Sequence, residues 1–454
     1  MKKLSPRILF ALAALVAMLA ACAPSGAPSA TISPIPTEQP TPLPSATQPP
    51  TPLPTDAAPA PTATASPTQQ GTPAVQPQAF NDCALLPVLP NCGSKAALLL
   101  SGELVVYDQA KQRLVGIDFK TGAAWQLPQP QPDLMSFSPS GKLVGLYYPG
   151  APSSQVETFD AASGLPQPPT VVLQGLLNWT PQDGLNTSQF RTTWSAGGDA
   201  AWIDSNTAVA HVRFAADPGK EVTWPVAPAP SDQIPQAVAW VPGTDLLLFE
   251  SHFASNDMWV TGGELSTLNV KTGEVKDLKA HMKLDFQFQW HPSQPGVMAL
   301  AESSSNPTMG GQRLAVLNVL TGQLKYLIED AMVVASYPSW LPDGKTILFA
   351  VSLPPAAVQS NPIFASQGIF LINSDGSGLR AVTKPDSTAQ QGDDHPQLLA
   401  GGKYFLYFRA QPGSSTLRLA ALDGSLDQPI TGPLPAPQCM AGPQCAWDSI
   451  AVYK

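Results

Sequence analysis

Charged residues are scarce in this chain of 454 residues: they make up 13% of it and leave a net charge of −9. Average proteins carry about 25% charged residues, so helices covered with exposed glutamate and lysine cannot dominate the fold. The 24 lysines and arginines are fewer than the 33 acidic residues, so no basic surplus is available to neutralise phosphates. We therefore expect no nucleic-acid partner.

Proline and glycine are plentiful instead. The 51 prolines and 34 glycines together make up about a fifth of the chain. Both residue types interrupt helices and favour turns, which predicts a β-rich fold with many short connections.

The N-terminus has the layout of a secretory signal. Lys2, Lys3 and Arg7 precede an apolar run over residues 8–21, which is too short to span a membrane. The run ends in Leu19-Ala-Ala-Cys22, which resembles the bacterial lipoprotein cleavage box. The resemblance implies that residues 1–21 are a signal peptide and that Cys22 carries the lipid. An ordinary signal peptide with an incidental cysteine is the alternative.

Residues 22–80 have the composition of a disordered linker. Between positions 23 and 79 the only charged residues are Glu38 and Asp56, and proline, threonine, serine and alanine recur throughout. Such a segment cannot bury enough apolar surface to fold, and proline-rich chains favour extended geometry. We expect a spacer that holds the following domain, residues 81–454, away from an extracytoplasmic membrane surface.

Four further cysteines are present, an even number for an oxidising compartment. Local pairing would join Cys83 to Cys92 and Cys439 to Cys445, whereas crossed pairing would tie the start of the domain to its end. The spacing leaves both arrangements open. No C-x-x-C spacing is present, which disfavours a zinc site.

An internal repeat organises the rest of the chain. Phe137-Ser-Pro-Ser-Gly-Lys142 before an apolar strand returns as Trp340-Leu-Pro-Asp-Gly-Lys345. Each copy is followed by a strand, a glycine turn and another strand, clearest over residues 368–383 and 313–326. Weaker copies of the first unit begin at Trp194, Trp240, Trp290, Leu398 and Trp447.

Four short strands repeated about every 50 residues are typical of a β-propeller, because a single small sheet cannot bury its faces alone. We predict an all-β fold with seven blades, six or eight being alternatives, and a ring closed by strands from both termini. The recurring tryptophans at the inner strands are expected to pack between blades.

The turn motifs at residues 137–142 and 340–345 and the hairpin at 368–383 resemble the repeats of TolB-like propellers, relatives of WD-repeat propellers in bacterial envelopes. The resemblance covers about residues 95–454. It implies a fold and a habit of binding proteins or small ligands, but no particular reaction. We expect a monomer without a cofactor.

Connection lengths predict one binding face. Turns within the repeat units are short, whereas residues 165–190, 353–366 and 384–395 form long connections on the opposite face. Polar residues at strand ends should border the channel mouth on this long-loop face. The candidates are Asp204, Glu250, His252, Asp285, Glu302, Asp393, Asp394, His395 and Arg409, together with Trp179 and Trp259 in or beside the loops.

The leading functional hypothesis is a lipid-anchored, non-catalytic propeller that binds an envelope protein, peptide or glycan. Carboxylates clustered with histidines can also bind a cation or act as general acid and base, so an envelope hydrolase or lyase is the alternative. No G-x-S-x-G, H-E-x-x-H or EF-hand motif accompanies them. A solute-capturing partner of a transporter is a third hypothesis and would require a deep aromatic pocket.

Overall fold

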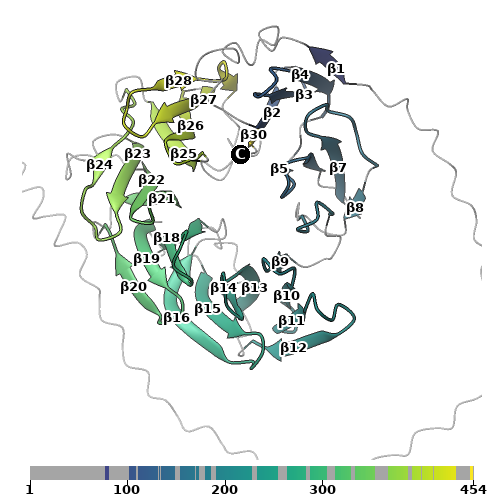
Figure 1. Ribbon diagram of the computed structural model, residues 1–454, viewed down its shortest axis with the longest axis vertical. Helices are drawn as coiled ribbons and strands as arrows, with labels where there is room; N and C mark the ends of the chain where they lie inside the picture. The colour runs from purple at the N-terminus through teal and green to yellow at the C-terminus, as the bar shows by residue number, and fades with distance from the viewer. Residues whose placement is uncertain are drawn as a thin grey trace, which may run out of the picture. The chain divides into compact units, whose positions relative to one another are not determined.

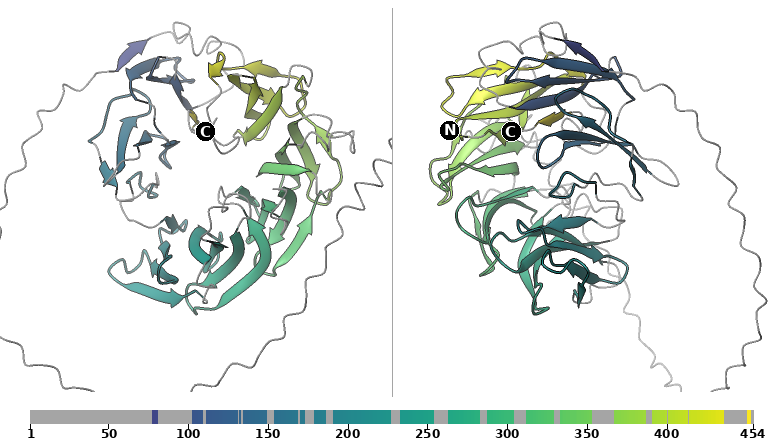
Figure 2. Two further views of the ribbon diagram at one scale, coloured as in Figure 1. Left: turned by 180° about the vertical axis from the view of Figure 1, so that it is seen from behind. Right: turned by 45° about the vertical axis from the view of Figure 1, so that its right-hand side comes forward.

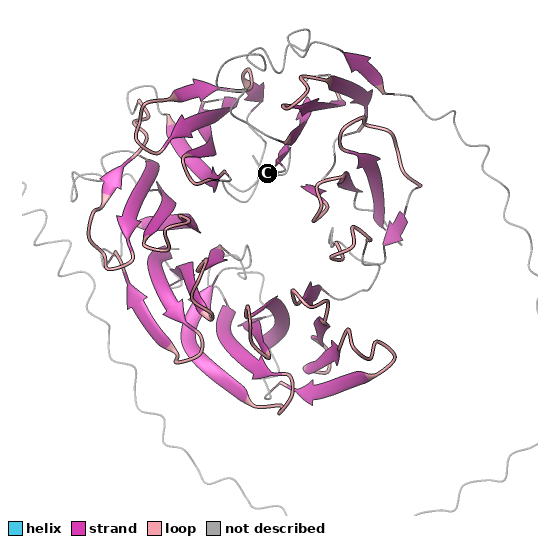
Figure 3. Cartoon of the chain, viewed as in Figure 1, coloured by secondary structure: helices cyan, strands magenta, loops and turns pink. Residues whose placement is uncertain are grey.

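Antiparallel β-strands make up all the regular structure described in a computed structural model of the chain (Figure 3). Of its two units, Met1–Gln70 and Gly71–Lys454, only the second contains described residues. Within them, no helix is suited to crossing a bilayer. The described residues are 77–80, 102–108, 111–130, 132, 134–148, 154–168, 170–172, 179–185, 191–226, 233–253, 263–282, 287–303, 312–328, 333–352, 367–386, 391–399, 401–412, 414–435 and 450–452.

One sheet joins strands that lie far apart in the sequence. Its order is β1-β4-β3-β2-β30, so the last described strand pairs with a strand near the start. The register aligns Val105 with Ala451. The strands are β1 (Gln78–Phe80), β2 (Glu103–Asp108), β3 (Arg113–Asp118), β4 (Ala124–Pro128) and β30 (Ile450–Val452).

The remaining strands follow one another as antiparallel meanders. They form separate sheets, except that β16 and β18 join two four-stranded groups through the pair Met282 and Glu302. The bounds are β5 (Leu134–Phe137), β6 (Leu143–Tyr148), β7 (Ser154–Asp160), β8 (Thr170–Val172), β9 (Thr192–Trp194), β10 (Ala200–Asp204), β11 (Val209–Arg213), β12 (Glu221–Pro225), β13 (Gln233–Trp240), β14 (Leu246–Phe253), β15 (Gly263–Asn269), β16 (Val275–Met282), β17 (Phe288–Trp290), β18 (Val297–Ser303), β19 (Gln312–Asn318), β20 (Gln323–Tyr326), β21 (Val334–Trp340), β22 (Thr346–Ser352), β23 (Gly368–Asn373), β24 (Arg380–Ala381), β25 (Gly392–Leu398), β26 (Tyr404–Gln411), β27 (Ser414–Ala421), β28 (Asp427–Pro429) and β29 (Leu434–Pro435).

The groups succeed one another in chain order about a common axis, with β5, β9, β13, β21 and β25 innermost (Figure 1). The views from behind and from the side show the same order (Figure 2). This confirms the predicted all-β propeller fold. The blade number and the closure of the ring stay predictions.

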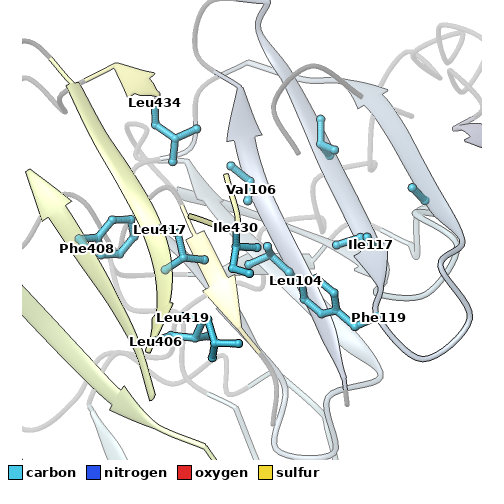
Figure 4. Packing of buried hydrophobic residues seen from close by; sticks show 12 residues of the cluster. Leu104, Val106, Ile117, Phe119, Leu406, Phe408, Leu417, Leu419, Ile430 and Leu434 are labelled. Carbon is cyan, nitrogen blue, oxygen red and sulfur yellow. The ribbon is translucent and has the colours of Figure 1, made fainter. Parts of the chain in front are cut away.

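Apolar side chains hold neighbouring blades together. Figure 4 shows one such cluster, in which Leu104 and Val106 of β2 meet Leu417 and Leu419 of β27. All four are fully shielded from solvent. The sheet that contains β2 therefore packs against the sheet that contains β27.

A second kind of contact joins the outer edges of the blades. A side chain of the fourth strand donates a hydrogen bond to a backbone carbonyl in the turn between the third and fourth strands of the next blade. Donor and acceptor lie 36 to 49 residues apart, so no local sequence pattern marks this contact. The pairs are Trp125 to Ala161, Trp224 to Val270, Lys276 to Leu320, Lys325 to Ser374 and Arg380 to Leu422.

Two details differ from the repeat analysis. Strand β1 falls within the residues expected to be linker, yet Ala79 pairs with Trp125 of β4, so the sheet begins before position 81. The shared sheet also contains a strand that the repeat motifs do not mark, β2, over Glu103–Asp108. Among the described residues, the C-terminal strand of this sheet is β30. Trp447, at which the last repeat unit is expected to begin, lies outside the described residues.

Candidate functional site

The described residues place most of the predicted site at the expected end of the strands. Glu250 lies opposite Gln236, and Arg409 lies opposite Asp393, in each case away from the short turn that joins the two strands. Asp285 and Trp259 lie outside the described residues, as do Cys22, Cys83, Cys92, Cys439 and Cys445.

Asp393 and Arg409 form a buried ion pair. Arg409 Nε donates to Asp393 Oδ1 at 2.7 Å and Nη2 donates to Oδ2 at 2.8 Å. The Asp393 side chain is 0% exposed. Burial raises the pKa of Asp393, while the hydrogen bond and charge of Arg409 act in the opposite direction. This paired carboxylate is held by its own sheet and is poorly suited to act as a free base.

Asp394 faces away from that pair, because successive residues of a strand point to opposite sides. His395 Nδ1 lies 3.3 Å from Asp394 Oδ2. His395 has a φ of 54° at a bulge in the pairing of β25 with β26. Its buried ring packs on Tyr337 of the neighbouring blade, with 3.9 Å between ring centroids. The three consecutive residues thus do not form one ligand cluster.

Glu250 and His252 form a separate group in β14. Glu250 Oε1 accepts a hydrogen bond from Gln236 at 2.7 Å and lies 3.5 Å from His252 Nδ1. Glu250 is completely buried, with Gly263 packed directly against its carboxylate. Burial lowers the pKa of Arg191 to about 10, and the nearby charge of Glu250 opposes this shift. At neutral pH, Arg191 thus remains a cation beside this buried carboxylate.

Glu302 forms a third group with residues that the sequence analysis did not select. Tyr326 donates its hydroxyl to Glu302 Oε2 at 3.1 Å, and Arg313 Nη2 lies 3.6 Å from the same oxygen. His281 Nδ1 lies 3.8 Å from Oε1. The nearby Glu302 carboxylate raises the pKa of His281. A sequence search could not link these residues, since they come from β16, β18, β19 and β20.

The raised pKa of His281 predicts a pH-dependent stability. Because the fold favours the protonated histidine, it gains stability at pH values below the unfolded-state pKa of about 6.5. This stability is lost as the pH rises through the higher folded-state pKa. The free energy of unfolding should therefore fall between about pH 6 and about pH 8, and fall less in His281→Gln. Urea unfolding at both pH values checks this. Equal pH dependence in both proteins would contradict it.

The three groups lie in different blades. Each carboxylate is engaged by a cation, an amide or a hydroxyl from its own sheet or the adjoining strand. Within the residues that the structure describes, no three histidine, cysteine or acidic side chains are grouped closely enough to hold a metal ion. The expected channel-mouth cluster is therefore divided into separate buried pairs.

Trp179 does not lie as the loop assignment predicted. Its indole Nε1 donates to Ser136 Oγ at 3.0 Å, beside the short turn at residues 138–142. Asp183 accepts a hydrogen bond from the backbone N–H of Ser140 in the same turn, and Leu185 packs against Tyr147. Residues 179–185 thus pack along the sheet of β5–β8 instead of standing on the long-loop face.

A pocket lies on the opposite face, which carries the turns between the first and second strands of each blade. We call this the short-turn face. The pocket has a volume of about 570 Å³ and is bordered by the turns at residues 194–199 and 241–245. Trp194, Trp240 and Trp290, which end β9, β13 and β17, contribute to its walls. Trp240 also packs between blades as expected, in a buried cluster with residues of β10 and β14.

The arrangement of the strands is that of a β-propeller. No family model matches the chain. A dipeptidyl-peptidase 5 from Porphyromonas endodontalis is 30% identical over 135 residues. That match covers 30% of this chain and 17% of the relative, so the chain spans only a small part of the curated protein.

Solved structures similar to this chain include two TolB proteins. TolB from Acinetobacter baumannii is 14% identical, with a TM-score of 0.32 and coverage of 64% of this chain and 68% of that one. A putative TolB from Agrobacterium tumefaciens is 12% identical, with a TM-score of 0.35 and coverage of 77% and 96%. An oligogalacturonate lyase in complex with manganese is 11% identical, with a TM-score of 0.42 and coverage of 71% and 82%.

Proposed function

We propose that this protein is a lipid-anchored, extracytoplasmic propeller that binds an envelope ligand without transforming it. The observation that carries the proposal is the pairing of those ionisable groups at the long-loop face that the structure describes. Asp393 is held by two hydrogen bonds from Arg409, and Glu302 is held by Tyr326. General acid and base catalysis needs groups that can reach a substrate and exchange a proton with it, and these buried pairs are poorly placed to do so.

Two substitutions distinguish this proposal from the alternative, an envelope hydrolase or lyase. We expect an envelope extract incubated with the full-length chain to yield no product that accumulates with time, as judged by mass spectrometry. Glu250→Gln and Glu302→Gln should leave that result unchanged. A product that accumulates with the wild type and is lost in either variant would establish catalysis and overturn the proposal.

The lipid anchor is tested by a single substitution. In a bacterial host, the full-length protein should sediment with membranes, because acyl chains on Cys22 insert into the bilayer. Cys22→Ala removes the acceptor sulfur, so the protein should be lost almost entirely from the washed membrane fraction. Ala23→Ser serves as the matched control. Immunoblots of fractions report the outcome, and retention of Cys22→Ala on membranes after a salt wash would contradict the anchor.

A further inference from the structure

We propose that the pocket on the short-turn face binds an uncharged oligosaccharide. The inference rests on the proposed binding function and names its ligand class and its site. The pocket volume of about 570 Å³ lies within the range that small-molecule sites occupy. The residues that border it lie in or just before the turns 194–199 and 241–245, and at Trp290.

The aromatic walls of the pocket are held in place by their surroundings. The Trp240 indole Nε1 donates to the backbone carbonyl of Thr193 at 3.2 Å, which ties β13 to β9. Phe288 contacts Trp290 edge to face, with 5.6 Å between ring centroids. Trp194 and Trp290 are only partly buried. Fixed, partly open indole rings offer flat apolar surfaces at little entropic cost, and the C–H faces of sugar rings match such surfaces.

Polar groups complete the lining. Ser195 and Asp199 lie in one turn, where the serine hydroxyl lies 3.1 Å from the aspartate carboxylate. Asp245 lies in the other turn and pairs with Lys271 at 3.0 Å. Its side chain remains 50% exposed. The site therefore combines carboxylate acceptors and a hydroxyl with aromatic faces, which suits a ligand that has apolar faces and many hydroxyl donors.

The same lining disfavours two other ligand classes. A proline-rich peptide would also pack on tryptophan, but each of its prolines lacks a backbone N–H, so it offers Asp199 and Asp245 fewer hydrogen-bond donors than a sugar ring does. An acidic saccharide would bring carboxylates towards the same two aspartates in a chain whose net charge is already −9. An uncharged sugar satisfies both the aromatic and the acceptor groups.

Titration of the full-length chain in detergent tests the inference. The probes are chitotetraose and cellotetraose, and their binding is measured by tryptophan fluorescence and by calorimetry. We expect saturable binding of at least one of them. Tetragalacturonate and a peptide with the sequence of residues 41–54 should bind at least about tenfold more weakly, or not measurably.

Two pairs of variants locate the site. Trp290→Ala should weaken binding about tenfold or more, whereas Trp202→Ala, which removes a tryptophan stacked on His211 away from the pocket, should leave it unchanged. Asp245→Asn should weaken binding severalfold. Its control, Asp277→Asn, alters a similar exposed aspartate paired with Lys279 outside the pocket. The Asp245 pair keeps the test valid if Trp290→Ala fails to fold.

The outcomes separate this inference from the proposed function. Three results would overturn the saccharide assignment. Neither neutral probe binds, or a variant and its control lose the same affinity, or the protein prefers the peptide or tetragalacturonate. Those results would leave a non-catalytic propeller intact. Cleavage of a probe would instead overturn the proposed function.

Discussion

Replacing Arg409 by leucine should lower the free energy of unfolding by about 3–5 kcal/mol, because it leaves a buried carboxylate without its partner. Asp393 is fully shielded and receives two hydrogen bonds from Arg409. Arg409→Lys keeps the charge but not the two-hydrogen-bond geometry, so its free energy of unfolding should fall by less than that of Arg409→Leu. Chemical denaturation of the three proteins measures the difference.

The loss in Arg409→Leu should depend on pH. Burial already raises the pKa of Asp393, and removing the cation removes the opposing effect. Because the folded-state pKa then lies above the unfolded value, protonation favours the folded variant, and its deficit should shrink as the pH falls from about 7 to about 4.

An exposed ion pair provides the control. In the pair of Lys271 with Asp245, the two side chains are 61% and 50% exposed, so Lys271→Leu should cost no more than about 1 kcal/mol at any pH. The buried-pair interpretation would be contradicted if Arg409→Leu lost no more stability than Lys271→Leu, or if its loss of stability grew as the pH fell.

Deletion of residues 450–454 should destabilise the propeller by on the order of 3 kcal/mol or more and promote association of the chain, because it turns β2 into an unpaired edge strand. Strand β30 pairs with β2 from Leu104 to Val106. Those three β2 side chains are completely buried, so disorder at this edge would disturb the core. Thermal unfolding and light scattering measure both effects.

A shorter deletion serves as the matched control. Removing only residues 453–454 leaves β30 in place and should preserve the stability of the full chain. If both deletions gave the same unfolding temperature and the same monomeric scattering, the pairing of β2 with β30 would contribute nothing to the fold.

The repeated turns were predictable because their chemistry is local. A glycine such as Gly344, with a φ of 62°, readily adopts the backbone conformation of a tight reversal, and its position marks both flanking strands. Strand β2 was missed because it lacks such a turn motif before it. The repeat order predicts that strands from both termini share a blade. The register of β2 on β30, which joins residues more than 340 positions apart, has no local sequence signal.

The candidate site was less predictable than the fold. Sequence position correctly placed Glu250, Asp393 and Arg409 at the strand ends away from the short turns. Whether a carboxylate is free depends on partners from other strands, such as Tyr326 for Glu302. The pocket was missed for a similar reason: its tryptophans recur at blade intervals, which predicts packing, and only the three-dimensional arrangement leaves Trp194 and Trp290 partly open.

Binding without turnover is the central functional claim, and glycan capture by the immobilised full-length chain tests it most directly. Neutral glycans from a bacterial envelope would be passed over the wild type, Trp290→Ala and Trp202→Ala, then eluted, quantified and compared by mass with the input. We predict saturable retention by the wild type and Trp202→Ala, severe loss in Trp290→Ala, and eluted glycans of unaltered mass. No retention by the wild type, or recovery of cleaved glycans, would contradict the claim. Retention that does not depend on Trp290 would contradict only the assignment of the pocket.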